Sequence, residues 1–545
     1  MMKFQKYILV LFTIIIFTSC KKDFLQRDPG VPIDFDKLFS DPMLAAGFGD
    51  NTYTFLINDY ARFVAAHQGT TGEFVDEAIS NTGLLPVSLV NSGQFLSPNA
   101  FDVATTYPTM YRGIRNANIM LENIEKVPWN ANYNPKFIRG EQVFLRAFFY
   151  FELMKRYGGV VLLNKAQTVE ESGMDLPRAS YDETLAFIIK DLDEASSLLP
   201  AEWIISGKDN GRATSGAAMA LKARALLHAA SPLNNPSGEA AKWKKAADAS
   251  RAIIDLNKYA LEASYENVLI QPNSKEYIMI SIKAPRDWVG YINDFIAPPS
   301  MAGQQSLISP TQNHVDLYEM SNGKPITDAT SGYNPQQPYL NRDPRFYNNL
   351  IYNDQNWIGR KVETYIGGRD NSTTTNIFTR TGYYLKRLWP EQIRKTGDRG
   401  ILNYVYLRYA EVLLNYAEAL NEAEGPTSAV YTAVNTVRIR AGLPVLPAGL
   451  TKDLMRARIR NERAVEFAFE DMRWWDVLRW KAGISIVTQP MKGMRITKTG
   501  TAFSYAEYNL AANYQKTFLD YMHLYPIPQS EIFKSSGALK QNPGW

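Results

Sequence analysis

The sequence is nearly devoid of cysteine, because Cys20 is the only one among 545 residues. A single thiol excludes an intramolecular disulfide framework and a site built from several thiolate ligands. The residues before it are a basic start followed by an apolar run from Tyr7 to Phe17 that only Thr13 interrupts. This run is shorter than the ~20 residues that span a bilayer. Together with the small residues before Cys20, it is typical of an export signal.

The position of Cys20 gives this segment a more specific interpretation. The arrangement resembles a bacterial lipoprotein signal, which implies that residues 1–19 are removed and that the mature chain begins at a lipid-modified Cys20. An ordinary secretory signal that ends beside a cysteine by chance is the alternative. In the first interpretation Cys20 is an anchor in the membrane lipid, and it has no catalytic or metal-binding role.

After Cys20 the sequence lacks a second long apolar run and a strong charge of either sign. The whole chain has a formal net charge of +4, and the signal segment contains Lys3 and Lys6, so the mature chain retains about +2. Nucleic-acid binding requires a concentrated basic surface, so no nucleic-acid partner is expected. Hydrophobic residues make up 45% of the chain, which is enough for a sizeable core.

The sequence also lacks the common catalytic motifs. It contains no G-x-S-x-G, no H-E-x-x-H and no phosphate-binding glycine loop with a lysine. Its four histidines are far apart, at His67, His228, His314 and His523. We therefore expect no catalytic residue, no metal site and no cofactor.

Helical periodicity is abundant. In residues 138–159 the apolar side chains recur at helical spacing, and the pattern ends at Gly158. Ser180 and Glu183 form a capping-box pattern at the start of the next segment. Further helices are predicted over residues 212–231, 239–257, 404–425 and 427–442. Helix pairs of roughly 34–40 residues resemble tetratricopeptide repeats. The predicted fold class is mainly α, with helical hairpins as a scaffold.

Residues 260–403 have a different character, with many Gly, Pro, Asn, Gln and aromatic residues and little helical period. We interpret them as long ordered loops with short strands, which in a compact protein are usually functional. A sugar is bound by an aromatic ring against its C–H face and by polar side chains along its hydroxyl edge. Residues that offer this combination are Trp288, Tyr291, Asn293 and Phe295, together with Tyr333 and Trp357.

A helix is predicted from about Lys452 through residues 460–480. Within it Glu466 and Glu470 are four residues apart, so their side chains would be neighbours. One hypothesis makes them the acid and nucleophile of a surface glycosidase. The alternative is an ion-pair lattice with nearby arginines that holds a central helix in place. We favour the lattice, because a helix covered on two sides leaves no room for a substrate.

Six longer segments occur in order from one end of the chain to the other: SCKKDFLQRDP, FLRAFFYFELMKRYGGVVLL, YLRYAEVLLNYAEALNEA, VRIRAGLP, IRNERAVEFAFEDMRWWDVLRW and LYPIPQSEIFKSSGALKQNPGW. Together they resemble the SusD/RagB family of outer-membrane, nutrient-binding lipoproteins. The resemblance implies a SusD-like fold on tetratricopeptide-like hairpins, with a loop-rich ligand-binding region and a few short strands. It also implies a surface-exposed outer-membrane lipoprotein that binds oligosaccharide or polysaccharide without catalysis. Its partner would be a SusC-like TonB-dependent transporter, to which it delivers the glycan.

The resemblance also suggests a domain division and further site residues. It implies an N-terminal SusD-like half over residues 20–260 and a C-terminal half over residues 261–545. Asp76 and Glu77 resemble an acidic pair that the family often carries near its ligand site. Because the RagB branch is associated with peptides, a peptide- or protein-binding lipoprotein is the alternative function.

Overall fold

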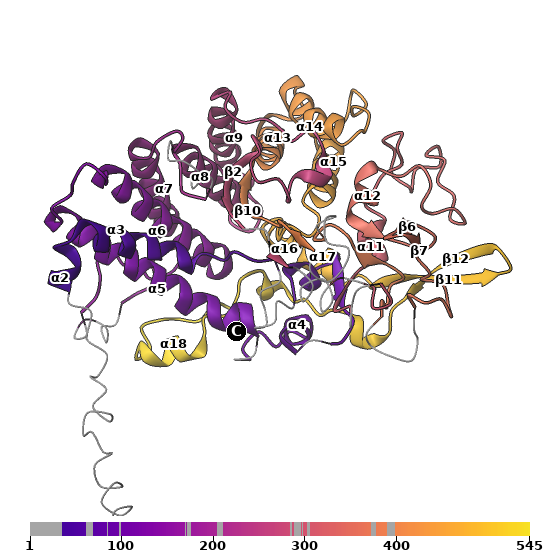
Figure 1. The fold of residues 1–545 in the computed structure, drawn as a ribbon, viewed down its shortest axis with the longest axis horizontal. Helices are drawn as coiled ribbons and strands as arrows, with labels where there is room; N and C mark the ends of the chain where they lie inside the picture. Colours follow the sequence, from indigo (N-terminus) through magenta and orange to yellow (C-terminus); the bar gives the residue numbers. More distant parts are fainter. Residues whose placement is uncertain are drawn as a thin grey trace, which may run out of the picture.

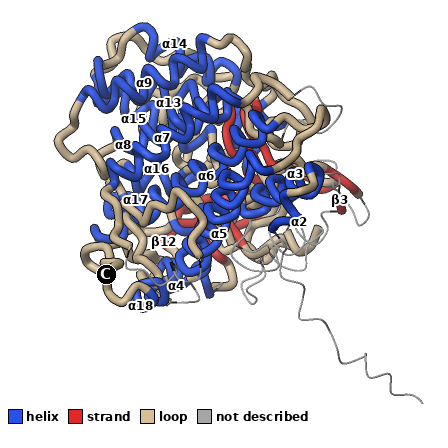
Figure 2. Tube along the Cα trace, turned by 90° about the vertical axis from the view of Figure 1, so that its left-hand side faces the viewer, coloured by secondary structure: helices blue, strands red, loops and turns tan. Residues whose placement is uncertain are grey.

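The computed structural model describes residues 35–60, 69–83, 85–97, 100–168, 171, 176–203, 211–283, 286–287, 296, 298–301, 306–371, 378–389 and 398–545. Helices dominate one side of the molecule, and long loops with short strands occupy the other (Figure 1). Seen from the side, α9 and α14 lie at one end, and α4, α5 and α18 lie at the opposite end (Figure 2). The prediction of a mainly helical fold is confirmed.

The helices vary from short turns to long scaffold elements. Their bounds are α2 (Phe35–Phe39), α3 (Pro42–Asn51), α4 (Leu85–Asn91), α5 (Phe101–Asn123), α6 (Pro135–Tyr157), α7 (Tyr181–Leu198), α8 (Ser215–Ala230), α9 (Ala240–Asp255), α11 (Gln312–Val315), α12 (Pro344–Asn349), α13 (Tyr409–Glu424), α14 (Ser428–Arg440), α15 (Lys452–Glu466), α16 (Arg473–Arg479), α17 (Gly483–Val487) and α18 (Gln529–Lys534). Among the described residues, none of these helices is long and apolar enough to cross a membrane.

The ends of the scaffold helices follow from local chemistry. At the start of α6, the side chain of Asn134 accepts a hydrogen bond from the backbone of Lys136, and the helix ends at Gly158, whose φ is +78°. At the start of α7, Ser180 and Glu183 form the predicted capping box, in which each side chain bonds to the backbone of the other residue.

Successive scaffold helices pack side by side. Each helix from α5 to α9 contacts the next one in the chain. In turn, α9 contacts α13, and α13 contacts α14. Alanine is frequent where α8 meets its neighbours, because a small side chain lets two helix backbones approach closely. One apolar core lies under α5–α8, and another lies among α8, α9, α13, α14 and α15. A third core fills the loop-rich side.

The strands form only two-stranded antiparallel pairs among the described residues. The pairs are β1 (Ala78–Ser80) with β4 (Ile308–Pro310), β2 (Tyr277–Ser281) with β10 (Tyr404–Arg408), β3 (Arg286–Asp287) with β9 (Arg399–Gly400), β5 (Leu350–Ile351) with β8 (Tyr384–Leu385), β6 (Asn356–Trp357) with β7 (Arg360–Lys361), and β11 (Lys492–Thr499) with β12 (Ala502–Asn509). The prediction of short strands within long loops is confirmed.

Two helix predictions are wrong in their extent. Residues 404–408 form β10 and not the first turn of a helix, because they pair with β2 from more than a hundred residues earlier. The helix predicted through residues 460–480 ends at Glu466. The chain then reverses through Phe469 and Asp471, whose φ angles are +62° and +61°, before α16 begins.

Candidate functional site

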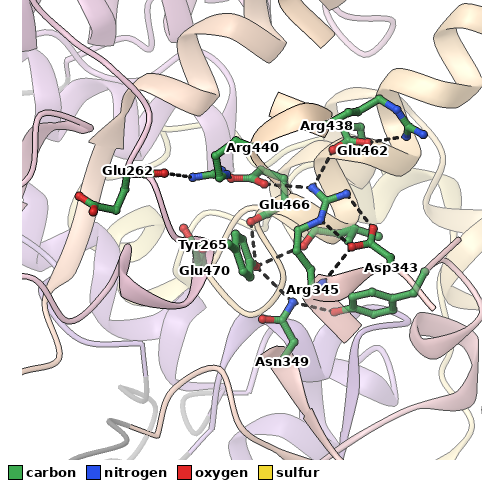
Figure 3. A network of polar contacts seen from close by, with 12 residues as sticks. Glu262, Tyr265, Asp343, Arg345, Asn349, Arg438, Arg440, Glu462, Glu466 and Glu470 are labelled. Atoms are coloured by element: carbon green, nitrogen blue, oxygen red, sulfur yellow. Dashed lines mark hydrogen bonds and ion pairs between the residues drawn. The ribbon is translucent and has the colours of Figure 1, made fainter. Parts of the chain in front are cut away.

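Glu466 lies at the centre of a buried network of ion pairs (Figure 3). Arg345 Nη1 lies 3.0 Å from Glu466 Oε2, and Arg408 Nη1 lies 2.6 Å from Glu466 Oε1. Arg440 also pairs with Glu466. Glu470 shares Arg408 with Glu466, at 2.8 Å, and also pairs with Arg387 at 2.7 Å.

This network excludes the glycosidase hypothesis for Glu466 and Glu470. Burial alone would raise the pKa of Glu466, but Arg440, Arg408 and Arg345 together hold it at about 2. A glycosidase acid needs a raised pKa, because it must donate a proton to the leaving group. Both carboxylates are also buried against arginines of the same chain. The interpretation as an ion-pair lattice is confirmed, although the two residues do not share one helix.

Asp76 and Glu77 are also buried. Asp76 accepts two hydrogen bonds from Arg473, at 3.0 Å from Nε and 2.8 Å from Nη2. Glu77 Oε1 accepts a hydrogen bond of 2.7 Å from the backbone N–H of Phe469. Burial raises the pKa of Glu77 to about 8, because Arg473 and the Phe469 N–H only partly compensate for the lost water. Both side chains accept hydrogen bonds from groups of the protein itself, and these bonds position the turn between α15 and α16.

The aromatic candidates differ in their surroundings. Tyr333 is half-buried, with the guanidinium of Arg342 5.5 Å from its ring centre. Trp357 is also half-buried and packs edge-on against Trp389, at 5.5 Å between ring centres. The other candidates lie outside the described residues: Cys20, Trp288, Tyr291, Asn293 and Phe295.

The hairpin formed by β11 and β12 projects from the loop-rich side (Figure 1). On one outer edge, the backbone N–H of Ile366 donates to the carbonyl of Ile496 at 2.9 Å. On the other edge, the side-chain amide of Gln336 donates to Tyr505 O at 3.0 Å and accepts from Tyr505 N–H at 3.1 Å. These contacts fix the middle of the hairpin, at the Ile496–Tyr505 pair, against the loops that surround it.

A pocket of about 170 Å³ lies between this hairpin and the segment around Arg380. Its apolar wall comes from side chains of the hairpin and of the facing loop. The residues that line the pocket are Ile366, Asn371, Thr379, Arg380, Gly382, Met494, Arg495, Ile496 and Tyr508. The volume is below the ~300 Å³ of a typical drug-sized site.

The polar groups of this pocket are held in place by the backbone around them. The hydroxyl of Tyr508 donates to the carbonyl of Arg380 at 2.5 Å, and the guanidinium of Arg495 lies 4.9 Å from the Tyr508 ring centre. The side chain of Asn81, directly after β1, accepts from the Arg380 N–H at 3.2 Å. The pocket therefore combines an aromatic ring, apolar walls and several hydrogen-bond donors. This is a combination that can bind a sugar by its C–H face and its hydroxyl edge.

None of these pocket residues was a candidate in the sequence. Arg380 is more than a hundred residues from Arg495 and Tyr508, which lie on the two opposite strands of the hairpin. No local sequence motif therefore joins the three residues. One signal was available, because residues 492–509 alternate in polarity about Gly500 and therefore predict a hairpin. That hairpin register would have placed Arg495 and Tyr508 on one face. Among the described residues, no cluster of acidic residues and histidines could hold a metal ion.

Comparison with known proteins agrees with this architecture. A family model described as "SusD family" matches residues 266–545, and one described as "Starch-binding associating with outer membrane" matches residues 67–227. A SusD-like protein of Formosa agariphila is 24% identical over 457 residues, which cover 81% of each chain.

Solved structures share the whole fold. A SusD-like protein from Bacteroides fragilis superposes with a TM-score of 0.79 at 28% identity, over 94% of this chain and 98% of that one. A second structure from the same species, a SusD-like carbohydrate-binding protein, has a TM-score of 0.76 at 23% identity, over 92% of this chain and 99% of that one. With more than half of its length matched by the family model, this chain belongs to the SusD family, whose members are binding proteins and not enzymes.

Proposed function

We propose that this protein captures oligosaccharide or polysaccharide at the outer membrane and delivers it, without catalysis, to a SusC-like TonB-dependent transporter. The observation that carries the proposal is the pocket between the hairpin and Arg380. There the ring of Tyr508, the guanidinium of Arg495 and the apolar walls converge on a space of about 170 Å³. Such a pocket would hold one sugar unit of the glycan, while neighbouring loops would contact its other sugar units.

The remaining candidates extend this site in our proposal. Trp288, Tyr291, Asn293 and Phe295 belong to the loop-rich segment and would supply a stacking platform, as would Tyr333 and Trp357. Asp76 and Glu77 would contribute indirectly. They fix the segment that continues through β1 to Asn81, whose side chain holds the backbone of Arg380.

The location is also part of the proposal. The export-type N-terminus and the family description "Starch-binding associating with outer membrane" support a position at that membrane. Cys20 would carry the lipid anchor, and the protein would face the cell exterior beside its transporter.

Binding of neutral polysaccharides by the full-length protein in detergent tests the proposal. We expect one or more glycans in a neutral panel to retard the protein in affinity electrophoresis. Tyr508→Ala should weaken that binding about tenfold or more, because it removes the ring, and Tyr508→Phe should retain most of it. Trp288→Ala tests the predicted platform in the same way. Tyr133→Ala, a half-buried tyrosine on the helical side, is the matched control.

Three outcomes are informative. Glycan binding that Tyr508→Ala weakens and Tyr133→Ala leaves unchanged supports the proposed site. Glycan binding that neither Tyr508→Ala nor Trp288→Ala affects contradicts the site but not the class of ligand. Binding of a mixed peptide digest with no glycan binding would contradict the proposed ligand and favour a peptide-binding function.

A further inference from the structure

A second and larger groove lies on the helical side, far from the hairpin. It has a volume of about 560 Å³, within the ~300–1,000 Å³ range of small-molecule sites. One wall is α5, another is the loop over residues 161–168, and the third is α18 with the residues after it. The lining includes apolar side chains of all three walls, among them Tyr111, Leu163 and Leu539.

The walls of this groove are fixed by hydrogen bonds. The hydroxyl of Tyr111 donates to Val161 O at 2.8 Å, and the amide of Asn118 donates to Leu163 O at 3.0 Å. On the opposite side, Arg178 donates to Lys540 O at 3.0 Å and to Asn542 Oδ1 at 2.9 Å. A ligand that enters such a preformed groove loses less free energy to ordering of the protein.

The charge of the lining is strongly asymmetric. Four cationic side chains, those of Arg112, Arg115, Lys165 and Lys534, line the groove with a single carboxylate, that of Glu531. Lys165 pairs with Glu171, and Lys534 pairs with Glu531. Two of the four cations are therefore already neutralised within the protein.

Arg112 and Arg115 differ from the two lysines. Among the ion pairs of the described residues, neither arginine has a carboxylate partner. Arg112 Nη2 donates to Thr109 Oγ1 at 3.1 Å, and Arg115 Nη1 donates to Gln167 O at 2.5 Å. A guanidinium group has further N–H donors, and both side chains are exposed on successive turns of α5. Their remaining donors are available for an anionic group, which guanidinium binds in bidentate geometry.

We infer that this groove is a second binding site, for an acidic saccharide. Arg112 and Arg115 would bind a carboxylate or sulfate group of the sugar, while Tyr111 and Leu163 contact its C–H face. The choice of a saccharide rests on the proposed function, whereas the requirement for an anion rests on the two arginines alone. The site differs from the hairpin pocket in both place and charge, so the two can be tested separately.

Calorimetry with the full-length protein in detergent tests this inference with four probes. They are a galacturonate tetramer, a sulfated disaccharide, a neutral cellotetraose and a tetraglutamate peptide. We expect at least one anionic saccharide to bind, with an affinity that falls as salt is raised, because a charge–charge interaction is screened. The first two probes distinguish a carboxylate from a sulfate as the recognised group.

The variant Arg112→Gln/Arg115→Gln should weaken this binding at least tenfold. Arg251→Gln is the matched control, because Arg251 is an exposed arginine on α9 that pairs with Asp255. Both variants should retain the thermal stability of the parent, since surface substitutions rarely change it much. Tyr508→Ala should leave binding of the acidic saccharide unchanged, which separates this groove from the proposed function.

Other outcomes would overturn the inference. Equal binding of the neutral tetramer and the anionic saccharides would exclude recognition of charge. Binding of anionic saccharides that survives the double substitution would place the site elsewhere. Binding of tetraglutamate alone, lost in the double variant, would show that the groove recognises an acidic protein segment and not a sugar.

Discussion

Arg473 and Asp76 are joined by two hydrogen bonds, of 3.0 and 2.8 Å, although they are 397 residues apart in sequence. Both side chains are buried, so the pair connects the start of α16 to the segment before β1 without solvent between them. The ion pair lets the N-terminal segment and the C-terminal half fix each other's position.

Replacing Asp76 by Ala should therefore lower the free energy of unfolding by about 3–5 kcal/mol, because it leaves the buried charge of Arg473 without a partner. Urea unfolding measures this loss. Asp248→Ala breaks an exposed ion pair with Lys244 within α9 and should cost far less, because solvent screens such a pair. Equal losses in the two variants would mean that the Asp76 ion pair does not hold these segments together.

Glu77 should make stability depend on pH. Its pKa is about 8 in the folded protein and 4.5 in the reference state, so between these values only the folded protein retains the proton. The contribution of Glu77 to the free energy of unfolding is therefore complete below about pH 4.5. It is lost as the pH rises through about 8. Asp76, Asp471 and Arg473 also act on this carboxyl. Burial lowers the pKa of Lys516 to about 7, which has the opposite effect on stability.

Comparing Glu77→Gln with the parent isolates the effect of the Glu77 carboxyl on stability, because the neighbouring groups are the same in both proteins. The stability of the variant relative to the parent should increase between pH 5 and pH 8, by at most about 1.4 kcal/mol per pH unit. Urea unfolding at pH 5, 6.5 and 8 gives the slope, and Glu125→Gln, at an exposed position, serves as the control. Parallel pH curves for Glu77→Gln and the parent would refute the prediction.

Gly382 should be intolerant of a side chain. Its φ is +86°, and an added Cβ would lie 2.6 Å from the backbone carbonyl of Met494 in the hairpin. Gly367 has a similar φ of +82° but no atom within 4 Å of such a Cβ. Both Ala variants should lose about 1–2 kcal/mol to backbone strain, and only Gly382→Ala should show a further loss, from displacement of the hairpin. A thermal melt of each variant measures the difference, and equal melting temperatures would exclude the steric effect.

Glu466→Gln should destabilise the protein and change no catalytic activity. Removing its charge leaves Arg345, Arg408 and Arg440 under-compensated in the core, at a cost of about 3 kcal/mol or more. Glu194→Gln, at a half-buried pair with Arg139, should cost less than about 1 kcal/mol. A reducing-end assay on a polysaccharide panel should give no product with the parent or either variant. Release of product by the parent that is lost in Glu466→Gln would overturn this assignment.

Local chemistry made much of the helical scaffold predictable. The capping box of Ser180 and Glu183 and the stop at Gly158 depend on residues within one turn, so they could be identified directly. The helix predicted at residues 404–408 failed because its competitor, β2, lies far away in sequence. A local periodic pattern contains no information about such a partner.

The break after Glu466 could not be predicted for a related reason. No glycine marks the turn, and the positive φ angles of Phe469 and Asp471 are stabilised by partners near the N-terminus. Glu77 accepts from the Phe469 N–H, and Thr71 donates to Asp471 at 2.5 Å. Composition predicts a ligand region in residues 260–403 but does not identify its binding rings: Tyr339, six residues after the candidate Tyr333, is only 7% exposed and packs against Phe346. Composition cannot distinguish a ring that packs in a loop core from one that faces a ligand.

The amide of Gln336 has a consequence for how this protein behaves beside copies of itself. A projecting hairpin presents two strand edges, and unpaired edges invite pairing with another chain and aggregation. Here Gln336 occupies the outward N–H and carbonyl of Tyr505, and Ile366 occupies the outward carbonyl of the opposite residue, Ile496. The middle of the hairpin is therefore closed to strand addition on both edges, so the hairpin can project into solvent while this part of it resists edge-to-edge association.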